Sequence, residues 1–389
     1  MRIALFILLD GVGWRHAEQA RFLAELCPYR QPLKTVLGYS CAAVPTILSG
    51  KLPVETRQWA MWFYSPETSP FRQAAWLVKV PSPVRRLLRV TRQQVIGDYK
   101  ARRGITGYCE VYQIPDELLP LMDTCIGKSL YLPKALSPVE SIFDRWREDG
   151  VPYRVYGYPT PDRETLDLVA ADLAQDPCRA YFLHLYETDS YLHGHCTEPT
   201  LVQARLTRYG EDIATLFRTA EAHGVPVDLL IFSDHGMTPV SGQYDLMRDI
   251  AQLRLTTGRD YVPFYDSSMA RFWFLRPTAE SRIRALLERL ECGRVLPEDE
   301  LVRLGICFPD RQFGQLIFLM RPGWVINPSH MGSVPLNGMH GFHPLEDPWA
   351  DAILLSTRPI PAPASHIADL YQLMCRSIRP GGPYDPDRA

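Results

Sequence analysis

The stretch IALFILLD, residues 3–10, decides the fold of this 389-residue chain. Its first seven residues are apolar, which is typical of a buried parallel strand, and the run stops at Asp10. Two later apolar runs follow the same pattern, YFLHLY before Asp189 and VDLLIF before Asp234. In an open α/β sheet, ligands bind beyond the carboxyl ends of such strands. The three runs therefore predict a parallel sheet with three carboxylates gathered at one edge.

Histidines accompany two of these acids. His193 follows Asp189 by four residues in DSYLH, so both side chains lie on one face if the segment is helical. His235 directly follows Asp234, and on a loop that leaves a strand both side chains can face one ion. Carboxylates gathered at one edge repel one another unless a cation lies among them. These residues therefore predict a metal site.

A second pair of histidines occurs late in the chain, His340 and His343 in NGMHGFHP. The glycines of this segment let the backbone approach a crowded site. We expect His340 to return to the edge of the sheet and to complete the metal-binding set. Oxygen and nitrogen ligands from Asp and His suit Zn²⁺, and also Mn²⁺ or Fe. The full set predicts two divalent metal ions.

The segment GYSCAAVPTILSGKLP, residues 38–53, contains the candidate nucleophile. Small residues followed by an apolar helical stretch predict that Ser40 lies at a helix N-terminus, where the free N–H groups and the dipole favour an anionic oxygen or a phosphoryl group. Cys41 is an alternative, since a helix N-terminus also lowers the pKa of a thiol. Thiolate chemistry would not need the flanking acids, so we favour Ser40. A purely structural alternative is that Ser40 caps the helix.

Strand-like and helix-like segments alternate along much of the chain, which predicts an α/β fold with a mostly parallel sheet flanked by helices. The predicted strands are 2–9, 152–157, 180–187 and 227–232, and the predicted helices are 16–26, 137–149, 163–175 and 199–223. Residues 65–135 break this rhythm and are predicted to form a cap or lid inserted into one catalytic domain, residues 1–389. Residues 240–335 are predicted to form a secondary subdomain with a small sheet that includes 272–275 and 315–319.

The composition is that of a globular protein, with 46% hydrophobic and 22% charged residues. A net charge of −2 gives no reason to expect a nucleic-acid polymer as partner. The nine cysteines are scattered without a C-x-x-C pair, which indicates free thiols in a reducing compartment. We interpret the short N-terminal apolar run as a strand rather than a signal peptide. We therefore expect a cytoplasmic protein.

Residues 72–103 are strongly basic, with nine Lys or Arg against one acid, Asp98. The simplest interpretation is a solvated helix of the cap. The alternative is a lid over an anionic substrate or a peripheral contact with a membrane surface. The sequence does not predict an oligomeric state.

Five motifs together resemble the alkaline phosphatase superfamily, and within it the type I phosphodiesterase and nucleotide pyrophosphatase branch. They are LDGVGW, YSCAAVPTILSGKLP, ETDSYLHGH, FSDHGM and MHGFHP, and they occur in the order typical of that superfamily. The resemblance implies an alkaline-phosphatase-like fold and hydrolysis of phosphoryl or sulfuryl esters by a Ser or Thr nucleophile and two metal ions. It further implies that Asp10, Ser40, Asp234 and His235 hold one ion, and that Asp189, His193 and His340 hold the other.

Two departures from the branch concern its nucleophile segment. The branch usually has threonine as the nucleophile and asparagine three residues later, where it contacts a phosphoryl oxygen; this chain has Ser40 and Ala43. Serine is the nucleophile of the monoesterase branch, so monoester cleavage stays open. The segment that follows is rich in aromatic residues, and Trp59, Trp62 and Tyr64 either contact a substrate or pack in the core.

The sequence thus predicts two-metal-dependent hydrolysis of a phosphodiester or pyrophosphate bond through a phosphoseryl intermediate on Ser40. The substrate is expected to be a small or lipid-linked phosphate ester. A phosphomonoesterase, a phospho-group transferase or a mutase would use the same residues. A protein of another class, a metal-stabilised binding protein without activity, is the remaining alternative.

Overall fold

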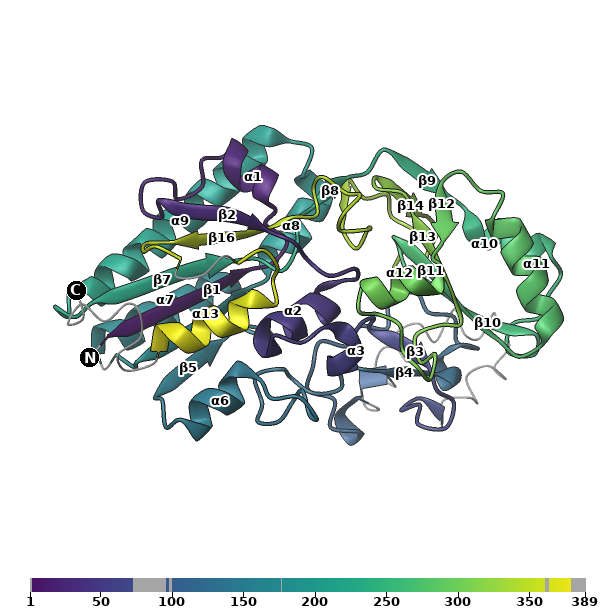
Figure 1. Ribbon diagram of the computed structural model, residues 1–389, viewed down its shortest axis with the longest axis horizontal. Coiled ribbons are helices and arrows are strands. Elements are labelled where there is room, and N and C mark those ends of the chain that lie inside the picture. The colour runs from purple at the N-terminus through teal and green to yellow at the C-terminus, as the bar shows by residue number, and fades with distance from the viewer. Residues whose placement is uncertain (1, 73–95, 98–99, 176, 361–363, 379–389) are drawn as a thin grey trace. The chain divides into compact units, whose positions relative to one another are not determined.

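The computed structural model describes residues 2–72, 96–97, 100–175, 177–360 and 364–378 (Figure 1). The chain forms two compact units. The first unit comprises Met1–Thr56, Leu136–Pro239 and Leu336–Ala389, and the second comprises Arg57–Ala135 and Val240–Pro335. Most of the basic segment 72–103 lies outside the described residues, and its role as a lid or surface contact stays a prediction.

The first unit is built on a six-stranded sheet with the strand order β2-β16-β7-β1-β6-β5. The bounds are β1 (Ile3–Leu9), β2 (Tyr29–Leu33), β5 (Tyr153–Tyr156), β6 (Ala180–Leu185), β7 (Val227–Phe232) and β16 (Ala352–Ser356). Strand β1 pairs in parallel with both β6 and β7, and β6 pairs in parallel with β5, whereas β16 is antiparallel to its two neighbours. The predicted α/β class with a mostly parallel sheet is confirmed.

Helices cover both faces of this sheet because its strands are apolar on both sides. Their bounds are α1 (Trp14–Gln19), α2 (Ser40–Ser49), α3 (Pro53–Thr56), α6 (Ile142–Glu148), α7 (Asp162–Gln175), α8 (Glu187–His195), α9 (Pro199–Glu221) and α13 (Asp369–Ile378). One face of β1, including Leu5 and Ile7, shares a core with residues of α7 and α9. On the other face Phe6 stacks against Trp146 of α6, with ring centroids 5.5 Å apart. A short ladder of β8 (Thr238–Pro239) and β15 (Gly338–Met339) completes the unit.

The second unit contains a four-stranded antiparallel sheet with the order β10-β11-β13-β12. Among the described residues, the strands of this unit are β3 (Trp62–Tyr64), β4 (Met122–Thr124), β9 (Gly242–Tyr244), β10 (Tyr261–Tyr265), β11 (Met269–Phe274), β12 (Gly293–Val295), β13 (Leu316–Met320) and β14 (Trp324–Ile326). Its helices include η2 (Leu119–Leu121), α10 (Leu246–Gln252), α11 (Pro277–Leu287) and α12 (Glu298–Arg303). The small sheet predicted around 272–275 and 315–319 is confirmed, since Phe272 of β11 pairs with Leu316 of β13.

Several predicted boundaries are wrong for local reasons. The helix expected over 137–149 begins only at Ile142, because Ser141 is extended and caps the helix. The helix expected over 16–26 ends at Gln19, and Arg21 and Leu23 then adopt positive φ values of 47° and 52°, which a right-handed helix cannot contain. The strand expected over 180–187 ends at Leu185, because the chain enters α8 at Glu187. This early turn into a helix decides where Asp189 and His193 lie. Among the described residues, the helices are all too short or too polar to span a bilayer.

Candidate metal centre

The carboxyl ends of three neighbouring parallel strands supply the acids of the site. Asp10 directly follows β1, Asp234 follows β7 after one intervening residue, and Asp189 lies in the first turn of α8, just beyond β6. Because β1 lies between β6 and β7, the three chain segments leave the sheet side by side. This is the placement that the apolar runs of the sequence predict.

Asp10, Asp234 and His235 form a first group of candidate ligands, called here the Asp10 cluster. One ligand atom from each lies within 4.8 Å of the others, and all three residues are buried. Nε2 of His235 is 3.2 Å from Oδ2 of Asp234 and 3.6 Å from Oδ1 of Asp10. The His235 Nδ1 is 3.0 Å from the carbonyl oxygen of Gly236, a contact that assigns the ring proton to Nδ1 and leaves the Nε2 lone pair facing the two carboxylates.

Asp189, His193 and His340 form a second group, called here the Asp189 cluster, whose ligand atoms also lie within 4.8 Å of one another. The Nε2 atom of His193 is 3.4 Å from Oδ2 of Asp189, one helical turn away on α8, and Nε2 of His340 is 3.6 Å from Oδ1 of Asp189. The Nδ1 atom of His193 lies 2.8 Å from the Gly338 carbonyl oxygen, which orients this ring in the same way as that of His235.

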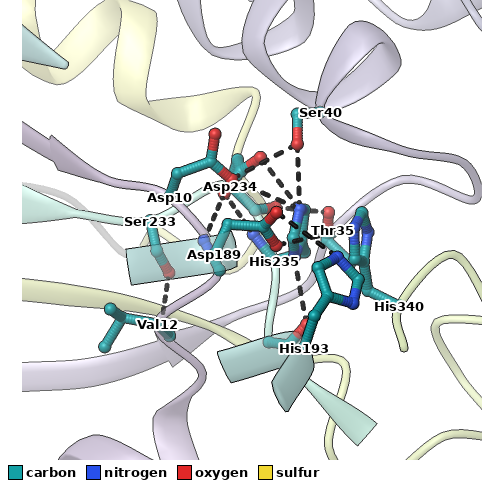
Figure 2. A network of polar contacts seen from close by, with 12 residues as sticks. Asp10, Val12, Thr35, Ser40, Asp189, His193, Ser233, Asp234, His235 and His340 are labelled. Atoms are coloured by element: carbon teal, nitrogen blue, oxygen red, sulfur yellow. Dashed lines mark hydrogen bonds and ion pairs between the residues drawn. The ribbon is translucent and has the colours of Figure 1, made fainter. Parts of the chain in front are cut away.

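The two clusters adjoin, as Figure 2 shows. The rings of His235 and His340 stack with centroids 3.6 Å apart and planes inclined by 10°. Gly11 lies against Asp189, and a Cβ atom at this position would come within 2.9 Å of Oδ1 of Asp189. Gly11 also has a φ of 75° and donates its N–H to Oδ1 of Asp234 at 3.2 Å. Only glycine fits both the conformation and the space that join the two clusters.

Ser40 is the first residue of α2 and lies beside the Asp10 cluster (Figure 2). Its hydroxyl donates to Oδ1 of Asp10 at 3.3 Å, and its oxygen is 3.0 Å from Nε2 of His235. The neighbouring N-cap residue, Tyr39, makes no side-chain capping bond to the helix. The structure therefore brings Ser40 and the six predicted Asp and His ligands together, whereas His343 belongs to neither cluster.

Burial and mutual repulsion perturb the acids of the site. The pKa of Asp10 is raised well above its ordinary value by burial and by the nearby carboxylates of Asp234 and Asp189. Burial also raises the pKa of Asp189, but the neighbouring His193 and His340 more than offset this effect and hold the pKa below its ordinary value. Within the described part of the chain, no lysine or arginine pairs with any of the three carboxylates. Such a group of buried acids calls for a cation from solution.

Unpartnered buried atoms show that the residues fit metal ions. Oδ1 of Asp189, Oδ2 of Asp234 and Nδ1 of His340 are buried without a hydrogen-bond partner among the described residues. A buried polar atom without a partner is unfavourable, and a carboxylate oxygen at a metal site finds its partner in the ion. Carboxylate oxygens and imidazole nitrogens suit Zn²⁺, Mn²⁺ and Fe. The donor set thus fits the two ions that the sequence predicts.

Three further polar residues support the ligands and were not predicted. Nε2 of His184, in β6, lies 3.2 Å from Oδ2 of Asp10, and burial lowers the pKa of this histidine to about 4. Thr35 donates to the backbone carbonyl of Asp234, and Ser233 donates to that of Val12. The one sequence signal for His184 is a polar residue within the apolar run YFLHLY, and strand alternation alone does not say what it contacts.

The predicted substrate contacts at Trp59 and Trp62 need correction. Both side chains are fully buried in the second unit. Trp59 packs against Phe308 and Phe313, and Trp62 belongs to the core that also contains Phe264. A fully enclosed ring cannot present a face to a substrate, so core packing is the better interpretation of these tryptophans. Tyr64 is partly exposed and lies near Trp273, and its contact with substrate stays a prediction.

The combination of this fold with this site places the protein in the alkaline phosphatase superfamily. The chain belongs to the type I phosphodiesterase/nucleotide pyrophosphatase family, whose model matches residues 4–343. Members of the family depend on metal ions and act on small nucleotide or phosphate ester substrates. The protein is therefore a phosphodiesterase/pyrophosphatase-like hydrolase.

Solved structures with the same fold include murine ectonucleotide pyrophosphatase/phosphodiesterase 5, with a TM-score of 0.66 at 14% identity over 97% of this chain and 95% of that chain. An inactive variant of the murine protein in complex with AMP gives the same values. The human protein of that name has a TM-score of 0.64 at 12% identity, over 97% and 94% of the two chains. At this identity the likeness concerns the fold. No curated protein matches the sequence.

Proposed function

We propose that this chain hydrolyses phosphodiester or pyrophosphate bonds, with Ser40 as the nucleophile and two divalent metal ions as cofactors. The observation that carries this proposal is the position of the Ser40 hydroxyl, 3.3 Å from Oδ1 of Asp10 and 3.0 Å from Nε2 of His235. A serine that merely caps a helix would bond to backbone N–H groups of its first turn. This hydroxyl instead donates to a carboxylate of the Asp10 cluster and lies beside the Nε2 lone pair of its histidine.

The residues divide between the ions according to the two clusters. Asp10, Ser40, Asp234 and His235 would hold one ion, and Asp189, His193 and His340 would hold the other. When bound, the two ions lower the pKa of the Ser40 hydroxyl and neutralise the charge that develops on the phosphoryl oxygens. The mixed oxygen and nitrogen ligands support Zn²⁺ first, with Mn²⁺ or Fe as alternatives.

The residues of the chain position the attack on phosphorus. Asp10 accepts the Ser40 hydroxyl hydrogen and holds its oxygen beside Nε2 of His235. The dipole of α2, a ten-residue helix that begins at Ser40, favours negative charge there. Attack forms the bond from Oγ to phosphorus, breaks the bond to the leaving oxygen and releases the hydroxyl proton, which the leaving oxygen can take up. Ser40 then carries the phosphoryl group, which keeps its second ester group when the substrate is a diester. Water then attacks the phosphorus from the vacated face, breaks the bond to Oγ and restores the serine.

The small residue at position 43 favours a second candidate function, cleavage of monoesters. Ala43 is buried in the first turn of α2 and offers no polar atom to a phosphoryl oxygen, where the family usually has asparagine. A diesterase that lacks this contact loses one of its means of orienting a diester. We therefore keep monoester hydrolysis as the alternative to be separated by experiment.

A nucleotide is the substrate class we propose first. The family acts on small nucleotide or phosphate ester substrates, and one structure with the same fold holds AMP. A p-nitrophenyl ester of a nucleoside monophosphate therefore belongs in the first assay, beside p-nitrophenyl phosphate and bis-p-nitrophenyl phosphate. Each substrate is to be tested with Zn²⁺, Mn²⁺ and Mg²⁺ in turn.

The outcomes of this assay separate the alternatives. We expect faster turnover of the diesters than of the monoester. Protein quenched during turnover and analysed by mass spectrometry should carry the phosphoryl group on Ser40, with the remaining ester group when the substrate is a diester. Faster monoester turnover would favour the second candidate. Added glycerol would accept the transferred group if the protein is a transferase. With the monoester, phosphoglycerol would then replace part of the free phosphate, and with a diester, a glycerol diester would replace part of the released monoester. Absence of turnover in protein with its full metal content would overturn the proposal.

A further inference from the structure

Helix α8 carries two side chains of the Asp189 cluster on one face. Asp189 lies in its first turn and His193 one turn later, so any shift of the helix moves both. The first N–H groups of a helix need partners from outside the helix. The N-cap residue of α8, Tyr186, supplies none through its side chain. The position of α8 therefore depends on what binds its N-terminus.

Asp162, the first residue of α7, binds that N-terminus. Its Oδ1 accepts the backbone N–H of Tyr186 at 3.0 Å, and its Oδ2 accepts that of Glu187 at 3.1 Å. The side chain thus caps a helix from which it is distant in sequence. A negative charge at a helix N-terminus is also stabilised by the helix dipole. The two bonds fix the position of the first turn along the helix axis and its rotation about that axis. This turn contains Asp189.

The Asp162 carboxylate is itself held in place. It is buried, and Oδ2 also accepts the hydroxyl hydrogen of Tyr209 from α9. Burial raises the pKa of Asp162, while its bonds to Tyr209, Glu187 and Tyr186 act in the opposite direction. A buried carboxylate with three donors is a rigid anchor, because breaking any bond leaves a buried polar group unpaired.

The other end of α8 is bound to the segment that carries the third member of the cluster. The backbone N–H of Asn337 donates to the carbonyl oxygen of His193 at 3.0 Å, and Nδ1 of His193 lies 2.8 Å from the carbonyl oxygen of Gly338. His340 follows directly after the short strand β15. Helix α8 therefore aligns all three side chains of the Asp189 cluster, and Asp162 holds the end of α8 where Asp189 lies.

We propose that Asp162 is a positioning residue for the Asp189 cluster: it fixes α8, and through it sets the metal affinity of this cluster and not that of the Asp10 cluster. The inference rests on the proposed function, in which both clusters bind metal ions. The Asp10 cluster takes its side chains from the ends of β1 and β7 and none from α8, so loss of the Asp162 cap leaves its geometry in place.

The test measures metal affinity at each cluster separately. In a His235→Ala background only the Asp189 cluster is complete, and in a His340→Ala background only the Asp10 cluster is complete. Zn²⁺ affinity is measured in each background by competition with a chromophoric chelator, with and without Asp162→Ala. We expect Asp162→Ala to weaken binding ~10–100-fold in the first background, the range for residues that orient metal ligands. In the second background we expect no change.

Asp144→Ala is the matched control. The Asp144 carboxylate is also buried and caps a helix of the same unit, α6, by accepting the N–H of Ser141 at 3.2 Å. Helix α6 carries none of the candidate ligands, so this variant should lower the melting temperature and leave both affinities unchanged. Asp162→Asn keeps one acceptor oxygen, so we expect it to recover part of the affinity. It also serves as the test variant if Asp162→Ala fails to fold.

The results distinguish this inference from the proposed function. If neither the unmodified chain nor either of the two single-cluster backgrounds binds Zn²⁺, the proposed function fails. The positioning role of Asp162 is overturned if both backgrounds bind Zn²⁺ and Asp162→Ala changes neither affinity. It is also overturned if Asp162→Ala weakens both affinities equally, as a general loss of structure would. Loss confined to the Asp189 cluster supports it. Cobalt-loaded protein adds a spectroscopic check, since only the absorption bands of the Asp189 cluster should change.

Discussion

The protein buries charge in two opposite ways, one in the core of the second unit and the other at the candidate metal centre of the first. In the second unit, Arg271 of β11 is fully buried, yet its Nε donates to Asp266 at 2.8 Å and its Nη1 donates to the carbonyl oxygen of Trp62 at 2.7 Å. The rings of Phe264 and Trp273 lie 5.0 and 5.6 Å from the guanidinium carbon. Its Nη2 is buried without a hydrogen-bond partner among the described residues, but the charge is balanced by residues of the same unit, through an ion pair and cation–π contacts.

In the first unit, Asp10, Asp189 and Asp234 are gathered with histidines as their neighbours, and no described lysine or arginine balances them. Burial of an unbalanced charge is unfavourable by several kcal/mol per ion, so such a group persists where binding or catalysis requires it. The comparison teaches that internal balance marks a structural charge, whereas charges left for a cation from solution mark a functional site.

Removal of the nucleophile should give the largest effect. Ser40→Ala deletes the attacking oxygen but leaves the three carboxylates and their need for cations unchanged. We expect turnover to fall by at least ~10³-fold, because a nucleophile acts as a unit with its activating groups. Metal content should stay near that of the wild type. Cys41→Ala is the control, and an inactive Cys41→Ala beside an active Ser40→Ala would move the nucleophile to the thiol.

Breaking the balanced ion pair in the second unit should lower the free energy of unfolding and leave the metal content unchanged. Arg271→Met leaves Asp266 buried without its partner, and such a change costs about 3–5 kcal/mol of unfolding free energy. Denaturant titration measures the loss, and elemental analysis should still find the wild-type metal content. The double variant Arg271→Met/Asp266→Leu removes both charges and should recover much of the loss. Equal destabilisation by both variants would contradict the view that balance is what matters here.

Removal of metal ions should affect the turnover and the stability that depend on the first unit, which carries the candidate ligands. We expect two transition-metal ions per chain in protein purified without chelator, because the seven candidate ligand side chains exceed what one tetrahedral zinc can bind. Ions at 100-fold excess over their dissociation constant stabilise a protein by about 2.7 kcal/mol per site. Chelation should therefore abolish turnover and lower the melting temperature, and Zn²⁺ should restore both. Active, stable protein without any metal would end this interpretation.

A pH dependence of stability should come from His330 in the second unit. Burial and the nearby Arg271 guanidinium lower the pKa of His330 to about 3, against an ordinary value of 6.5. Between these values the unfolded chain binds the proton and the folded chain does not, so stability falls as pH falls through this window. We expect a slope of at most ~1.4 kcal/mol per pH unit from this group. His330→Asn should lessen this slope without abolishing it, because the lowered pKa of His184 acts in the same pH range. An unchanged curve would exclude His330 as a source.

The smallest effect concerns the basic segment 72–103. Charge reversal at Arg85, Arg86 and Arg89, which lie outside the described residues, should raise KM for an anionic substrate and weaken its salt dependence. It should leave kcat for a small nitrophenyl ester nearly unchanged. Steady-state kinetics at two ionic strengths measures both values. Equal losses on both substrates would mean that the segment is structural.

Local sequence patterns predict much of this architecture. The strand expected over 227–232 is β7, because a short apolar run is a local signal for a buried strand. The serine expected at a helix N-terminus begins α2, because small residues before an apolar stretch are a local signal for a helix start. The same holds for Asp189 and His193, whose four-residue spacing places them together on α8. Candidate ligands that follow strands or share a helix face can therefore be found without a structure.

The supporting residues could not be found in this way. In the sequence, His184 is one residue of a predicted strand, and its contact with Asp10 joins residues 174 positions apart. Asp162 gave no signal, since its partners are backbone N–H groups of another helix. The tryptophans at 59 and 62 misled for the opposite reason, because aromatic residues serve cores and ligand sites equally well. Such contacts depend on tertiary packing, which no local pattern encodes.

The stacked rings of His235 and His340 have a consequence for the order of the candidate ligands. The two rings belong to different clusters, yet their centroids lie 3.6 Å apart, so each ring limits the positions open to the other (Figure 2). A group that orients one ring therefore also restricts its neighbour. We expect His235→Ala to loosen the ring of His340 and His340→Ala to loosen that of His235, so affinities are comparable only between variants that both keep or both lack this stacking.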